Sequence, residues 1–307
     1  SDGNGSHAST LKSPSYTKSV SWQHYPDDEK AFYWLKLAAE QGHCEAQYSL
    51  GRKYSEEKSR HKDNEQAIFW LKKAALQGHT FASNALGWIL DRGEDPNYKE
   101  AVAWYQIAAE SGMSYAQNNL GWMYRNGNGV AQDYTLAFFW YKQAALQGHS
   151  YAQDNLADLY KDGEGVAQNK SLAAFWYLKS AQQGNRHAQF QIAWDYNAGE
   201  GVDQDYKQAM YWYLKAAAQE SVGAYVNIGY MYKHGQGVEK DYQAAFEWFT
   251  KAAECNDATA WYNLAIMYHY GEGRPVDLRL ALDLYRKVQS SGTRDVSQEI
   301  REIEDLL

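Results

Sequence analysis

Small and aromatic residues recur along the chain at helical spacing, in a pattern that returns about every 36 residues. The first pattern, A-x2-W-x3-A-A-x2-G, begins at Ala31, Ala67, Ala101, Ala137, Ala173, Ala209, Ala245 and Ala281. Its fourth position is tryptophan in every copy except the last, which has Leu284. The apolar positions fall at i, i+3, i+4, i+7 and i+8, so they form one stripe along an α-helix.

A second helical pattern, A-x3-[LI]-[GA]-x2-Y, alternates with the first. It begins at Ala46, Ala82, Ala116, Ala152, Ala188, Ala224 and Ala260. Glycines separate the two helices of each repeat: Gly42 and its equivalents follow one helix, and a G-x-G turn such as Gly127/Gly129 follows the other. Left-handed glycines of this kind end helices, and aspartates such as Asp133 just before the next helix are typical N-caps.

One helix pair cannot bury such stripes alone, whereas stacked pairs can. We therefore expect an all-α solenoid. We expect a flexible segment or tag at 1–27, a helix at 28–42, seven repeats at 43–292 and a capping helix at 293–307. The apolar stripe of that cap is Val296, Ile300, Ile303 and Leu307. The glycine or alanine at the sixth position of the second pattern should let a tryptophan of a neighbouring helix approach closely.

The residues Ala116–Gly148 match almost in full the signature A-x3-L-G-x-M-Y-x2-G-x-G-V-x2-D-Y-x2-A-x2-W-Y-x2-A-A-x2-G, and Ala224–Asn256 match nearly as well. Over roughly 31–292 the chain thus resembles the Sel1-like repeat family, relatives of the tetratricopeptide repeat. The resemblance implies a right-handed α-solenoid and an adaptor that holds partners in protein complexes. The long, Trp-rich array resembles exported bacterial members of the LpnE type, which act on host cells.

The composition of the chain argues for a folded protein and against some classes of partner. Hydrophobic residues make up 45% and charged residues 22% of the chain, enough apolar side chains for a packed core. The net charge of −8 argues against nucleic acid or an anionic membrane as the main partner, since both attract basic surfaces. The chain begins at Ser1 without a methionine, so a signal peptide could have been removed before it. The resemblance to exported bacterial members then implies export from a bacterium rather than a cytoplasmic location.

The resemblance places the first helix of each pair on a concave face, where a partner segment would bind. Six residues after the alanine of the second pattern, four repeats carry an aromatic residue, although Arg52, Asp158 and Ile266 show that the repeat does not require one. Aromatic residues and arginine are typical interface anchors. The predicted partner-binding residues are Trp88, Trp122, Trp194, Tyr230, Phe81, Tyr115, Tyr151, Arg125, Lys161, Asn119 and Asn155. Alternatively, the tryptophans pad the contact between repeats and the asparagines cap or bridge.

Residues that could carry chemistry do not converge. His43, His79 and His149 occupy equivalent positions of separate repeats, too far apart for one metal ion. The G-x-G turns lack the flanking strand and lysine of a phosphate-binding loop. We therefore expect no cofactor, no metal and no enzyme activity, and interpret the chain as a scaffold that binds a protein or peptide in its concave groove. An exported effector that engages a host protein is the alternative, and a hydrolytic enzyme is a weaker one.

Overall fold

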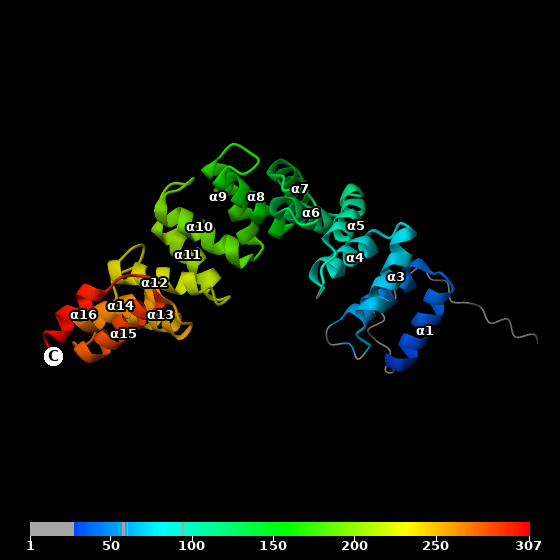
Figure 1. Ribbon diagram of the computed structural model, residues 1–307. Coiled ribbons are helices and arrows are strands. Elements are labelled where there is room, and N and C mark those ends of the chain that lie inside the picture. The colour runs from blue at the N-terminus through cyan, green and yellow to red at the C-terminus, as the bar shows by residue number, and fades with distance from the viewer. Residues whose placement is uncertain (1–27, 57–58, 60, 94) are drawn as a thin grey trace, which may run out of the picture. The chain divides into compact units, whose positions relative to one another are not determined.

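The computed structural model describes residues 28–56, 59, 61–93 and 95–307, so the predicted flexible segment at 1–27 lies outside the described residues. The described residues form 16 α-helices in the predicted repeating order (Figure 1). They are α1 (Asp28–Glu40), α2 (Cys44–Ser55), α3 (Asn64–Leu76), α4 (Thr80–Arg92), α5 (Tyr98–Glu110), α6 (Ser114–Asn126), α7 (Tyr134–Leu146), α8 (Ser150–Asp162), α9 (Lys170–Gln182), α10 (Arg186–Ala198), α11 (Tyr206–Ala217), α12 (Val222–His234), α13 (Tyr242–Glu254), α14 (Ala258–Tyr270), α15 (Leu278–Ser291) and α16 (Ser297–Glu304). The predicted all-α repeat fold is confirmed.

The described residues divide into two compact units, one up to Ala85 and the other from Leu86 on, with the boundary inside α4. In the first unit α2 packs against both α1 and α3. Its core is formed by Leu35 and Ala39 of α1, Leu50 of α2 and Trp70 of α3, all buried. Short apolar stripes on three helices thus supply this core, as the periodicity predicts.

In the second unit each helix packs against the helices before and after it in sequence, and the closest pairs are α6 with α7, α8 with α9, α10 with α11, α12 with α13, and α14 with α15. We call the even-numbered helices α2–α14 the first helices and the odd-numbered helices α3–α15 the second helices. The chain ends on α16, which packs on α15 and buries Val296 and Ile303. Leu307 is 62% exposed, so its predicted place in the apolar stripe was wrong.

Capping residues set the helix ends. The Asp133 carboxylate accepts hydrogen bonds from the Thr135 and Leu136 backbone N–H groups at the start of α7. Asp205 and Asp241 cap α11 and α13 in the same way, as predicted. The first helices α6, α8, α10, α12 and α14 each end at a glycine with a positive φ near 70°. The spacing of these glycines therefore fixes where each first helix stops.

The close approach inside a helix pair involves a tyrosine rather than the predicted tryptophan. A Cβ added to Gly121 of α6 would lie 2.8 Å from the Tyr141 ring of α7. Tyr141 is fully buried there, whereas the preceding residue, Trp140, packs against the core of the preceding repeat. Successive residues of a helix point about 100° apart, so one ring faces its own pair and the other faces the neighbour.

Buried glutamines join consecutive repeats. The Gln153 side-chain amide of α8 donates to the Ala145 carbonyl of α7 at 3.2 Å, and the Gln183 amide after α9 donates to the Gln153 carbonyl at 2.7 Å. The same link is made by the pairs Gln47/Gln77, Gln117/Gln147 and Gln189/Gln219. Repeats that lack one glutamine lack both, and carry Ser83/Ser111, Tyr225/Cys255 and Trp261/Ser291 instead.

Candidate functional site

The first helices present aromatic side chains to solvent. Trp88 of α4 and Trp122 of α6 are 46% and 42% exposed. Tyr115, Tyr151 and Tyr230 are also exposed on α6, α8 and α12. In the first unit, Phe81 is exposed and its ring lies near the rings of Tyr48 and His79. These predicted partner-binding residues are therefore at the surface.

Trp194 of α10 differs from the other predicted aromatic anchors. It is only partly exposed and packs against the core of residues 157–231. The Lys161 ammonium nitrogen lies 5.6 Å from the centre of its ring, within the range of a cation–π contact. Trp194 thus offers a partner less free surface than Trp88 and Trp122 do.

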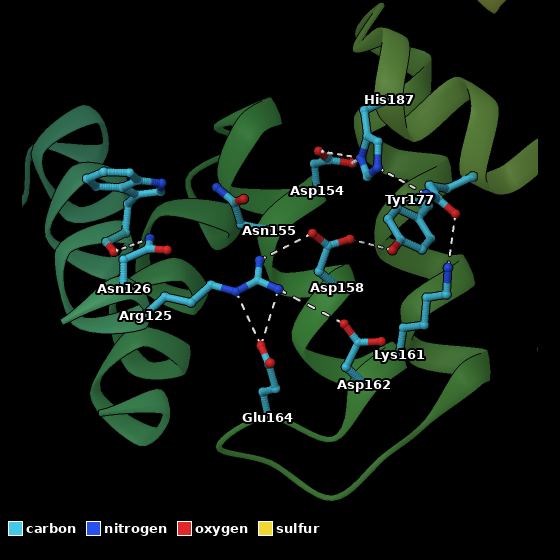
Figure 2. A network of polar contacts seen from close by, with 12 residues as sticks. Arg125, Asn126, Asp154, Asn155, Asp158, Lys161, Asp162, Glu164, Tyr177 and His187 are labelled. Carbon is cyan, nitrogen blue, oxygen red and sulfur yellow. Dashed lines mark hydrogen bonds and ion pairs between the residues drawn. The ribbon is translucent and has the colours of Figure 1, made fainter. Parts of the chain in front are cut away.

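A polar network joins α6, α8 and α10 beside these aromatic residues (Figure 2). The Arg125 guanidinium of α6 lies 3.3 Å from the Asp158 carboxylate and 3.2 Å from that of Glu164. Asp162 is a third acidic neighbour, at 4.0 Å. One cation therefore faces three carboxylates, and negative charge is left in excess on this part of the surface.

Asp158 is also held from the second helix of its own pair. The Tyr177 hydroxyl of α9 donates to the Asp158 carboxylate at 2.5 Å. Burial and the adjacent Asp158 charge both raise the pKa of Tyr177, so its hydroxyl stays protonated and remains a donor. The Tyr105 hydroxyl donates to Asp91 of α4 at 2.7 Å in a similar contact. These tyrosines reach from the core to the face of the first helices.

The rest of the network consists of contacts between side chains of α8 and α10. The His187 Nδ1 atom lies 3.0 Å from both oxygens of Asp154, and its Nε2 atom lies 3.0 Å from the Gln191 amide nitrogen. The Lys161 ammonium donates to the Gln191 carbonyl oxygen at 3.0 Å. The hydrogen bond with Asp154 raises the pKa of His187, although burial opposes the shift. A neutral ring protonated on Nδ1 satisfies both contacts.

The network engages several residues that the sequence suggested as anchors. Arg125 is paired with carboxylates, Lys161 bonds to Gln191, and the Asn155 amide donates to Asn118 of the preceding repeat at 3.0 Å. Asn119 is partly buried on α6. Their role in binding a partner stays a prediction.

Replacing Arg125 with alanine should destabilise the array by about 1 kcal/mol, because three carboxylates would lose their shared cation in a partly buried setting. Chemical denaturation followed by circular dichroism measures the change. The control is Lys170→Ala, which removes an exposed ion pair with Glu200 and should cost almost nothing. Equal losses in both variants would contradict a special role for the network.

Two of the three histidines at equivalent repeat positions cap the starts of helices. The Nδ1 atoms of His79 and His149 accept hydrogen bonds from the backbone N–H groups of Ala82 and Ala152. Among the residues that the structure describes, no three His, Cys, Asp or Glu side chains gather in a way that could hold a metal ion. The ring nitrogens of His187 meet the Asp154 carboxylate and the Gln191 amide.

Asp195 of α10 is a feature that the sequence reasoning missed. It is only 5% exposed. At this position α2 carries the exposed Lys53, and the five remaining first helices carry the buried apolar residues Ile89, Met123, Leu159, Met231 and Met267. Burial raises the pKa of Asp195 to about 7; Glu200 adds to the shift, and Lys161 opposes it. Alignment of the repeats with one another would have revealed this carboxylate, because it replaces an apolar residue of the repeat.

Similarity to known proteins agrees with the geometry. The family model of the Sel1 repeat matches eight consecutive segments, 23–43, 44–79, 80–113, 114–149, 150–185, 186–221, 222–257 and 258–287. The chain belongs to the Sel1 repeat family. The matching family describes a repeat that builds scaffolds, and no finer subtype such as LpnE follows from it.

Three relatives show how far the likeness extends. The Sel1-repeat-containing protein YbeQ of Escherichia coli (strain K12) is 94% identical over 108 residues, which are 35% of this chain and 33% of YbeQ. The crystal structure of c5321, a protective antigen present in uropathogenic Escherichia coli strains, is 35% identical with a TM-score of 0.79, covering 85% of this chain and 56% of c5321. A Sel1 repeat protein from Oxalobacter formigenes is 31% identical with a TM-score of 0.64, covering 70% of this chain and 86% of that protein. This Sel1 repeat chain thus spans a third of YbeQ and little more than half of c5321.

The helices of this Sel1 repeat array are short. None of those in the described ranges is long and apolar enough to cross a membrane.

Proposed function

We propose that this Sel1 repeat chain is a non-enzymatic scaffold that holds a segment of a partner protein on the face of its first helices. In a solenoid this face is expected to form a concave groove. The observation that supports the proposal is the exposure of Trp88 and Trp122. Equivalent positions carry Asp158 and Ile266, so the fold does not need tryptophan there.

The surroundings of Trp122 suggest the chemistry of the segment. Arg125 lies one helical turn further along α6, within the group of carboxylates formed by Asp158, Asp162 and Glu164. An exposed indole beside an excess of carboxylates suits a lysine or arginine side chain, which the ring attracts through a cation–π contact. The partner segment is therefore a basic one, with Tyr115 and Tyr151 contacting its flanks.

The test compares proteins captured by the purified wild-type chain with those captured by Trp88→Ala/Trp122→Ala. The partner identified with wild type should bind the double variant at least about tenfold more weakly, because aromatic anchors dominate interface energies. Phe139→Ala/Phe175→Ala is the matched control, since it removes two exposed rings from second helices and should retain the partner. Equal binding by the wild type and the tryptophan variant would contradict the proposal.

A second candidate function is that of an exported bacterial protein of the LpnE type that engages a host protein through the same face. The similarity to c5321 supports it, since that protein is described as a protective antigen in uropathogenic strains. Expression of the complete gene product with a carboxyl-terminal tag, followed by fractionation, tests it. Tagged protein in the medium or at the cell surface would support export, and tagged protein confined to the cytoplasm would contradict it.

A further inference from the structure

Three consecutive second helices, α7, α9 and α11, carry apolar residues on their outward side as well as on their buried side. The outward aromatic residues are Phe139, Phe175 and Tyr211, which occupy the same position of three successive repeats and are all exposed. Exposed leucines accompany them, at Leu136, Leu146, Leu172 and Leu214. A helix that is apolar all round is normally covered on all sides. No described part of the chain covers these side chains, so they form an unpartnered surface.

The repeat itself does not call for aromatic residues at this position. Within the same unit the equivalent residues are Ala103 on α5, Glu247 on α13 and Asp283 on α15. Those helices pack in the same way without an outward ring. Within the second unit, Phe139, Phe175 and Tyr211 are therefore additions to the repeat limited to three neighbouring pairs. In the first unit, α1 and α3 carry exposed aromatic residues at the same position, Tyr33 and Phe69.

The charge of this surface has one sign. The helices α7, α9 and α11 contain no aspartate or glutamate. Their exposed lysines are Lys142, Lys179, Lys207 and Lys215, in addition to Lys170, which is paired with Glu200. The aspartates Asp133 and Asp205, which precede α7 and α11, cap the starts of these helices through backbone N–H groups.

Acidic residues return on both sides of the three helices. The outward side of α5 carries Glu100 and Glu110, and that of α13 carries Glu247 and Glu254. In a chain with a net charge of −8, a basic apolar surface bounded by acids is a local feature, which the overall charge conceals. We name it the lysine face, defined by Phe139, Phe175, Tyr211 and the four exposed lysines.

We propose that the lysine face binds the surface of an anionic lipid bilayer. Lysines interleaved with exposed leucine and aromatic side chains are the composition of helices that lie in the interface of a membrane. The lysines would meet lipid phosphates while the rings and leucines enter the boundary of the acyl chains. A protein partner fits this surface less well, because protein interfaces are enriched in arginine and depleted in lysine.

Two of the four lysines of the lysine face lie next to a ring of that face. The Lys179 ammonium lies 5.7 Å from the centre of the Phe175 ring, and the Lys215 ammonium lies 5.6 Å from that of Tyr211. Each pair is one helical turn apart, so the charge and the ring project from the same side of the helix. Both groups can therefore reach one flat surface together, as binding to a bilayer requires.

Vesicle flotation tests the proposal with the full chain. We expect wild-type protein to float with vesicles that contain about 30% phosphatidylglycerol in phosphatidylcholine, and at least about tenfold less with phosphatidylcholine alone, because the lysines supply the attraction. Lys179→Glu/Lys215→Glu should abolish flotation. Lys251→Glu/Lys287→Glu changes the same helical position on α13 and α15, and the net charge by the same amount, so it is the matched control and should retain flotation.

A second variant, Phe139→Ser/Phe175→Ser, tests the apolar contact at unchanged charge, and circular dichroism checks that each variant is folded. Loss of flotation in this variant supports entry of the rings into the bilayer, and undiminished flotation overturns it. The proposal is also overturned if wild type shows no preference for anionic vesicles, or if the control variant loses flotation as the Lys179/Lys215 variant does. Binding to soluble polyglutamate without binding to vesicles would likewise overturn it, and would assign the face to an acidic protein.

Discussion

Gly165→Ala should destabilise the array by about 3 kcal/mol, because the residue has both a left-handed backbone and no space for a Cβ. Its φ is +69°, and an added Cβ would overlap the carbonyl group of Tyr134 and approach the nitrogen of Thr135. These atoms belong to the backbone at the start of α7, so no side-chain rotation can relieve the overlap. Thermal and denaturant unfolding followed by circular dichroism measures the loss.

The control for this prediction is Gly148→Ala. Gly148 also has a positive φ, of +88°, but no atom lies within 4 Å of an added Cβ. Gly148→Ala should lower the free energy of unfolding by only about 1 kcal/mol, which is the penalty of the backbone conformation alone. If the two variants lose the same stability, the close approach of the turn to the preceding helix pair does not matter energetically.

Asp195→Leu should stabilise the protein by about 2 kcal/mol at pH 8. The folded state raises the pKa of Asp195 to about 7, against about 3.9 in an unfolded chain. Ionising this buried carboxylate therefore costs folding free energy, about 1.4 kcal/mol for each unit of pKa shift before relaxation of the site reduces it. Leucine stands at the equivalent place in the preceding repeat, as the buried Leu159, so the site can hold an apolar side chain.

The stability gained by Asp195→Leu should depend on pH. Between about pH 4 and pH 7 the folded state binds a proton at Asp195 that the unfolded state has lost, so wild-type stability falls as the pH rises through this range. The gain from Asp195→Leu should therefore be small near pH 4 and complete above pH 7. Melting temperatures across this range measure it, with the exposed Asp203→Asn as control. A gain independent of pH would show that Asp195 is ionised in the folded protein throughout.

The fold could be predicted from the sequence because its determinants are local. Helical stripes, the N-cap at Asp133 and the left-handed Gly127 each depend on a few neighbouring residues. It could not be predicted that Tyr141, and not Trp140, makes the close contact with Gly121. The two rings are adjacent in sequence, and only the crossing of the helices decides which one faces the pair.

The candidate site was harder to predict because its contacts join different repeats. In the sequence Arg125 has no evident partner, because the carboxylates that it contacts lie 33 to 39 residues further along the chain. Asp195 and the outward ring of Phe139 were visible in principle, since each departs from its own repeat. Neither residue follows from the shared signature, because that signature describes only the positions that the repeats have in common.

The glutamine pairs described above determine how far a local opening should spread. In repeat arrays each unit is stabilised by its immediate neighbours. In the second unit, hydrogen-bonded glutamine pairs that include Gln147, Gln183 and Gln219 link three consecutive repeats to their neighbours. The two joints between repeats that follow Gln219 have no such pair. Local unfolding that begins at the carboxyl-terminal end should therefore spread through the two joints without a glutamine pair and stop at Gln219. The last two repeats should then exchange their amide protons together, while the middle of the array stays folded.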